Sequence, residues 1–75
     1  MPRSNIKVGY SDSREKWLVA LNGEVRSQHQ KKQPAEREGR RVAKKNEPSR
    51  FTVQRKDGGV SYEQFYGGSN NDGLF

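Results

Sequence analysis

The sequence contains no cysteine and a single histidine, His29. Disulfide bridges and thiolate metal sites are therefore excluded. Without a cluster of metal-ligating side chains we expect no metal site and no cofactor. The absence of cysteine fits a reducing compartment, and we predict a cytoplasmic protein.

Long apolar runs are also missing. No stretch approaches the roughly 18 apolar residues that a membrane-spanning helix needs. The first residues, MPRSNIKVGYSDS, lack the apolar segment of a signal peptide. We therefore expect neither a membrane span nor a secretory leader.

Residues suited to a hydrophobic core are few. Only 13 of the 75 residues are Leu, Ile, Val or Phe, whereas 32% of the residues are charged. That composition lies near the disordered class. The apolar residues nevertheless recur at strand and helix periods between turn signals. We therefore predict one small domain over residues 1–67, followed by a polar, Gly-rich and flexible tail over residues 68–75.

Alternation of apolar and polar residues predicts five strands. Asn22-Gly23 and Asp57-Gly58-Gly59 are typical of hairpin turns, because these residues accept positive φ angles. The third strand is the least marked, since Val25 is its only clear apolar anchor. The predicted strands are Ile6–Tyr10, Lys16–Leu21, Glu24–Gln28, Arg50–Lys56 and Val60–Tyr66.

One amphipathic helix is predicted over Gln33–Lys45, with Pro34 in its first turn. Its apolar face is about 100° wide and consists of small residues, Ala35, Gly39, Val42 and Ala43. We expect this face to approach a sheet closely and Trp17 to pack against it. The predicted fold is α+β, a small antiparallel β-sheet with one α-helix packed on one face, in the order β-β-β-α-β-β.

Several short motifs occur in a particular order and spacing. In that order the chain resembles a family of short bacterial and archaeal proteins known as domain of unknown function 2188, over about residues 5 to 67. The resemblance implies a compact β-rich domain with one helix, and it implies no established activity. The motifs are Trp17-x-Val19, Asn22-Gly23, Ser27, His29, Ala35-x-x-x-Gly39-x-x-x-Ala43-Lys44, Phe51-x-Val53-x-Arg55-x-Asp57-Gly58 and Tyr66-Gly67.

Positive charge is concentrated in one segment. Lys31 to Arg50 holds eight Lys or Arg and three Glu, a local balance of +5 in a chain of net charge +6. Arg37, Arg41 and Lys44 would lie opposite the apolar side of the helix. We expect Lys31, Lys32 and Arg50 to widen this patch beyond the ends of the helix. Organised charge of this kind favours an anionic partner.

We interpret the basic segment as a contact site for nucleic-acid phosphates, and we include the later Arg55 and Lys56 among the candidate residues. Tyr62, Phe65 and Tyr66 could stack on unpaired bases, although packing within the sheet is the favoured interpretation. A solvated face and an acidic protein or membrane surface remain alternatives. The candidate residues are Lys31, Lys32, Arg37, Arg40, Arg41, Lys44, Lys45, Arg50, Arg55 and Lys56.

Catalysis has little support in the sequence. His29 has no cysteine or serine nucleophile motif beside it, and its favoured interpretation is a packed residue between strand and helix. No glycine-rich phosphate-binding motif occurs. We therefore expect a non-enzymatic binding module without a small-molecule substrate. The alternative is a protein-interaction or self-association module that uses a sheet edge or the small-residue face of the helix.

Overall fold

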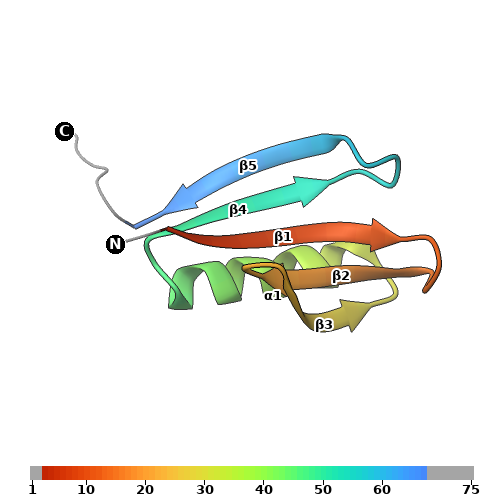
Figure 1. Cartoon of the computed structure of the whole chain (residues 1–75), viewed down its shortest axis with the longest axis horizontal. Helices are drawn as coiled ribbons and strands as arrows, with labels where there is room; N and C mark the ends of the chain where they lie inside the picture. Colours follow the sequence, from red (N-terminus) through yellow and green to blue (C-terminus); the bar gives the residue numbers. More distant parts are fainter. Residues whose placement is uncertain (1–2, 68–75) are drawn as a thin grey trace.

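The computed structural model describes residues 3–67, and these residues form the predicted α+β fold (Figure 1). A five-stranded sheet has the strand order β3-β2-β1-β4-β5, and the helix α1 lies on one side of it. The elements are β1 (Ser4–Ser11), β2 (Lys16–Leu21), β3 (Glu24–His29), α1 (Lys32–Lys45), β4 (Ser49–Gln54) and β5 (Val60–Tyr66).

One strand pairing differs from the expected antiparallel sheet. Three pairings are antiparallel, but β1 and β4 run parallel in the centre of the sheet. The reason is the direction of the chain, because α1 carries it back along the sheet so that β4 starts beside the start of β1. Val8 therefore lies between Val19 of β2 and Val53 of β4.

The hydrophobic core lies between the sheet and α1, as the alternation predicts. Alternate residues of the central strands point to this side and are buried, whereas their neighbours point to the opposite, open face of the sheet. The buried core residues are Ile6, Val8, Trp17, Val19, Ala35, Ala43, Phe51 and Val53.

Three residues of the small-residue face of α1, Ala35, Gly39 and Ala43, are buried against the sheet and are not free for another chain, while Val42 is partly buried. A Cβ atom at Gly39 would lie 2.5 Å from the Phe51 ring and 2.8 Å from a methyl group of Val8. Trp17 is buried as predicted, with 6% of its surface exposed, and its ring meets Tyr10 edge-on at 5.3 Å. Phe51 and Val8 therefore occupy the place beside Gly39 that the sequence prediction gave to Trp17.

The helix begins one residue before the predicted start. Lys31 is the N-cap residue and its side chain makes no capping hydrogen bond, while Pro34 is the third helical residue. At the C-terminal end of the helix, the backbone carbonyl groups do have side-chain hydrogen-bond partners. The Asn46 side chain donates to the Val42 carbonyl at 2.7 Å, and the buried Ser49 hydroxyl donates to the Ala43 carbonyl, also at 2.7 Å.

The strand β5 has a β-bulge near its start. Val53 pairs with Tyr62 while Gln54 pairs with Val60, so Ser61 is the extra residue. Beyond the bulge, Tyr62 and Tyr66 face the helix side and are partly buried. Phe65 is 58% exposed on the open face. The tail predicted over residues 68–75 lies outside the described residues.

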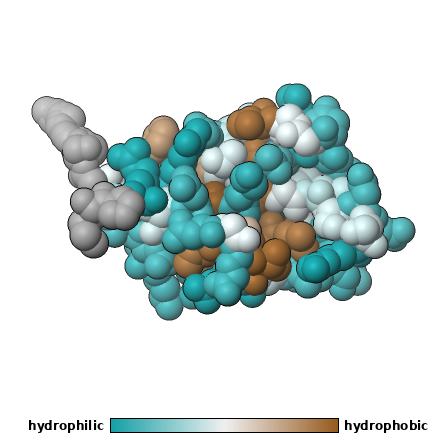
Figure 2. Space-filling model, in the orientation of Figure 1, coloured by the Kyte–Doolittle hydropathy of each residue, from teal (hydrophilic) through white to brown (hydrophobic). Residues whose placement is uncertain are grey.

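Hydrophilic side chains cover most of the surface seen in Figure 2, and hydrophobic ones emerge in separate patches. Within residues 3–67, no helix is long and apolar enough to cross a membrane.

Candidate nucleic-acid interface

The outer side of α1 carries a shallow hollow of about 480 Å³. Four basic side chains and one carboxylate line it, so the local charge is strongly positive. We call this region the basic helix surface. Its residues are His29, Pro34, Arg37, Glu38, Arg40, Arg41 and Lys44.

Arg37 and Lys44 are the two exposed cations of this surface that have no ion-pair partner within residues 3–67. Among the described residues, no carboxylate oxygen lies within 4.0 Å of either side chain. The Lys44 ammonium lies 6.0 Å from the centre of the Tyr66 ring. Both charges are therefore available to a partner in solution.

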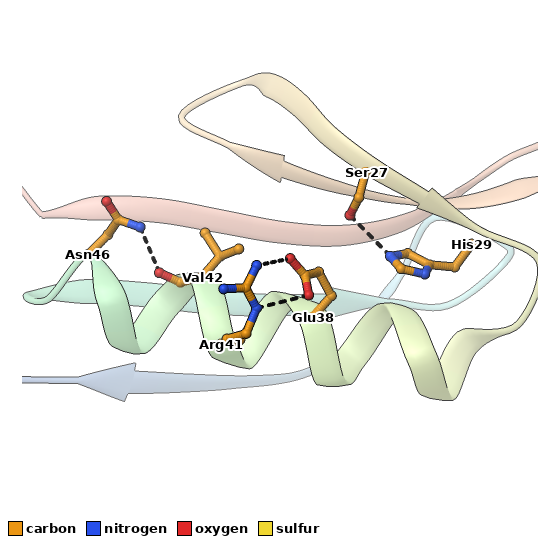
Figure 3. A network of polar contacts seen from close by, with 6 residues as sticks. All are labelled: Ser27, His29, Glu38, Arg41, Val42 and Asn46. Carbon is orange, nitrogen blue, oxygen red and sulfur yellow. Dashed lines mark hydrogen bonds and ion pairs between the residues drawn. The ribbon is translucent and has the colours of Figure 1, made fainter.

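Arg41 is exposed but paired with Glu38 one turn earlier (Figure 3). Its Nε donates to Glu38 Oε1 at 3.0 Å and its Nη2 donates to Oε2 at 2.5 Å. The hydrogen bonds from Arg41 lower the pKa of the Glu38 carboxyl, and the same hydrogen bonds raise the pKa of Arg41. Part of the charge of Arg41 is therefore already offset within the helix.

Arg40 contacts the sheet with its guanidinium, although 41% of its side chain remains exposed. Its Nη2 donates to the Tyr62 hydroxyl at 2.7 Å, and that hydroxyl donates to Glu36 Oε1, also at 2.7 Å. Its guanidinium lies 5.8 Å from the centre of the Phe51 ring. Arg40 therefore links α1 to β5, and we assign it a structural role beside any contact with a partner.

The pKa of Tyr62 is raised to about 12, chiefly by burial and next by its hydrogen bond to Glu36. Both causes favour the neutral phenol, which can donate to the carboxylate. The link between α1 and β5 is therefore built on a protonated tyrosine.

Lys32 and Lys56 gather at a different place, around one pair of aromatic rings. The Lys32 ammonium lies 5.6 Å from the Trp17 ring centre, and the Lys56 ammonium lies 4.7 Å from that of Tyr10. Such cation–π contacts hold both side chains near the start of α1. Lys31, the N-cap residue, is exposed beside them.

Two other candidates are paired with carboxylates. Arg55 Nε lies 3.3 Å from Asp57 Oδ1 in the β4–β5 turn. The pKa of Asp57 is lowered by the Gly59 backbone N–H and then by Arg55. Arg50 donates to Glu63 Oε2 from Nε at 2.9 Å and from Nη2 at 2.6 Å.

The sequence predicts that Arg50 widens the basic helix surface, and this prediction is wrong. Its neighbours Ser49 and Phe51 are buried on the helix side of β4, so the alternation of the strand places Arg50 on the open face. The candidate cations therefore fall into separate groups. The outer side of α1 holds the largest one, and Lys45 extends it toward the end of the helix.

Sequence reasoning missed two members of this region. His29 lines the basic helix surface, and its Nε2 lies 3.0 Å from the Ser27 hydroxyl on the same strand (Figure 3). Arg26 lines an adjoining hollow of about 340 Å³ together with Arg41 and Lys45. Alternation along β3 gave a weak signal, because the strand is short and a bulge at Arg26 interrupts it.

The aromatic residues of β5 do not form one exposed stack. Tyr62 and Tyr66 pack near Phe51 on the helix side, with ring centres 6.2 and 6.4 Å from it. Phe65 lies on the open face, where the Arg3 guanidinium is 5.0 Å from its centre. Packing within the sheet therefore accounts for the two tyrosines.

The described part of the chain contains no group of three or more His, Cys, Asp or Glu residues placed to hold a metal ion. No match was found among curated proteins, and none among solved structures. A family model described as an uncharacterized protein conserved in bacteria, DUF2188, matches residues 8–64. This match covers most of the chain and all six elements in whole or in part, and the chain belongs to the DUF2188 family.

Proposed function

We propose that this protein binds nucleic acid through the basic helix surface and does so without catalysis. The observation that carries the proposal is the lining of one shallow hollow by four basic side chains and one carboxylate. Arg37 and Lys44, which have no ion-pair partner among the described residues, supply the charge that an anion would meet first.

The spacing of the cations suits a phosphate backbone. Arg37, Arg41 and Lys44 follow one another at four and three positions, which places them on one side of the helix over roughly 10 Å. An arginine can hold a phosphate through two parallel hydrogen bonds, and Lys44 adds a point charge. The region thus offers phosphate contacts and few groups that could read bases, so binding with little sequence preference is expected.

Salt dependence is the test of this mechanism. Phosphate binding releases counterions, and each contact adds roughly 0.7–0.9 to the slope of log affinity against log salt concentration. Three to five contacts predict a slope of about −2 to −4. Titration of a fluorescent oligonucleotide at several salt concentrations measures it. Absence of binding by the wild type at low salt would reject the proposal.

A matched pair of double variants separates the basic helix surface from net charge alone. Arg37→Gln with Lys44→Gln removes these two cations, and should reduce the slope by roughly 1.5 and weaken binding at low salt. Lys7→Gln with Arg14→Gln changes the net charge equally at exposed positions away from α1. This control should keep the wild-type slope. Equal losses in both double variants would show that overall charge, and not this surface, binds the oligonucleotide.

A further inference from the structure

The two edges of the sheet differ in how they are protected against pairing with another strand. Native sheets protect an edge with Lys, Pro, a bulge or a covering element. The edge strand β3 has six residues, a bulge at Arg26, and an ion pair between Arg26 and Glu24 at 3.8 Å. The helix α1 also packs against it.

The other edge, β5, lacks most of these protections. Its seven residues, VSYEQFY, include no Lys, Arg or Pro, and its single charged residue, Glu63, is bound by Arg50 on β4. The bulge at Ser61 lies near its start, so Tyr62 to Tyr66 is a regular strand. Within residues 3–67, no strand pairs with its outer side (Figure 1).

We propose that β5 pairs antiparallel with β5 of a second copy of this chain, which joins the two sheets into one of ten strands. Centring the pairing on Gln64 places Gln64 opposite its own counterpart and Tyr62 opposite Tyr66. Residues of the same face then meet, as a continuous sheet requires. This proposal does not depend on nucleic-acid binding.

The partner strand comes from a second copy of the chain because β5 is complementary to itself in this register. Tyr62 and Tyr66 form two aromatic cross-strand pairs, which stabilise antiparallel strands. On the open face, Glu63 of the second copy lies opposite Phe65, and the Arg3 guanidinium already sits 5.0 Å from that ring. A register centred on Glu63 would instead set two carboxylates opposite each other, which is unfavourable.

Charge also favours this edge over other surfaces. Two copies of a chain with net charge +6 repel each other, and β5 is a strand without basic residues. A single pair of strands forms a small interface, so we expect weak association that depends on concentration. Mass measured by sedimentation should rise from monomer toward dimer between micromolar and millimolar concentrations. A chain that stays monomeric throughout this range would overturn the proposal.

Cross-linking tests the register, because the chain has no cysteine of its own. Directly opposed residues of an antiparallel pair have Cβ atoms about 4.5–5.5 Å apart, close to the separation that a disulfide needs. Oxidised Gln64→Cys should therefore give a covalent dimer. The control Gln28→Cys, at an exposed glutamine of the other edge strand, should give little. Equal cross-linking of both variants, or preferential cross-linking of Gln28→Cys, would overturn the proposal.

Charge reversal at the same position gives an independent test. Gln64→Lys and Gln64→Glu each place like charges opposite each other, so each variant alone should remain monomeric where the wild type dimerises. An equal mixture should recover dimers, because opposite charges then meet across the strands. Far-UV circular dichroism checks that both variants fold. Variants that dimerise as well alone as in the mixture would contradict the proposed register.

Discussion

Gly39 shows how a single residue sets the distance between the helix and the sheet. Glycine in the middle of a helix costs about 1 kcal/mol relative to alanine. Here a Cβ atom would lie 2.5 Å from the Phe51 ring, which is itself fully buried. The close approach of α1 to the sheet therefore depends on the missing side chain.

We predict that Gly39→Ala destabilises the protein despite the better helix propensity of alanine. Overpacking of a filled core costs roughly 1–3 kcal/mol, which exceeds the gain of about 1 kcal/mol in propensity. Urea unfolding measures the difference. Gln33→Ala, at an exposed position of the same helix, should leave stability unchanged or slightly higher. A Gly39→Ala variant more stable than the wild type would show that the helix can move away from Phe51 at little cost.

At the scale of elements, α1 and β5 are linked by a short series of side-chain hydrogen bonds. Tyr62 accepts a hydrogen bond from Arg40 and donates one to Glu36, so a residue of the edge strand is tied to two residues of the helix. The helix packs against β1, β2, β3 and β4, and these hydrogen bonds extend its contacts to β5 at the edge of the sheet. They hold β5 in place on the side that faces the helix.

Alkaline pH should weaken this link, and Tyr62→Phe should remove the effect. The folded protein raises the pKa of Tyr62 from 10.0 to about 12, so the folded state holds the phenolic proton more tightly than the unfolded state. The stabilisation is complete below pH 10.0 and is lost as the pH rises toward about 12. Unfolding free energies of wild type and variant, measured across this range, should converge. Parallel pH profiles would show that Tyr62 does not titrate differently on folding.

At the scale of the whole molecule, a single core joins β1, β2, α1 and β4, and residues of β5 pack against it. Trp17 belongs to that core and is the one tryptophan of the chain, so its fluorescence reports on the packing of the domain. We predict that Trp17 fluorescence and far-UV circular dichroism follow the same unfolding transition. Trp17→Ala should cost roughly 3–5 kcal/mol, enough to abolish the transition in a domain of this size. A water-exposed Trp17 without a cooperative transition in the wild type would contradict the fold.

Local patterns in the sequence predict the elements well, because period-2 and period-3.6 patterns decide which side of a strand or helix is buried. The small-residue face of α1 and the alternation of β4 are examples. The alternation along β4 also predicts that Arg50 lies on the face opposite the helix. The prediction of the basic patch did not take this alternation into account. The side chain of Arg40 was unpredictable at this level, because its direction is set by Tyr62, a residue 22 positions away.

The strand order was the least predictable feature of the fold, because no local pattern specifies which strands become neighbours. Turn residues predict that β1, β2 and β3 form a meander, and that β4 and β5 form a hairpin. Nothing in either segment shows that the hairpin adds beside β1 and not beside β3. Tertiary packing decides this, since the position beside β1 brings Phe51 under Gly39.

The parallel pairing of β1 and β4 has a consequence for the order of folding during synthesis. Val8 and Val53 are neighbours across this pair although 45 positions separate them in the chain. The strands β1, β2 and β3 leave the ribosome before β4. The edge of β1 that pairs with β4 therefore stays open until β4 follows. Closing a loop of this length carries an entropy cost and slows folding. Nascent chains that stop before Phe51 therefore lack the strand that pairs with this edge of β1.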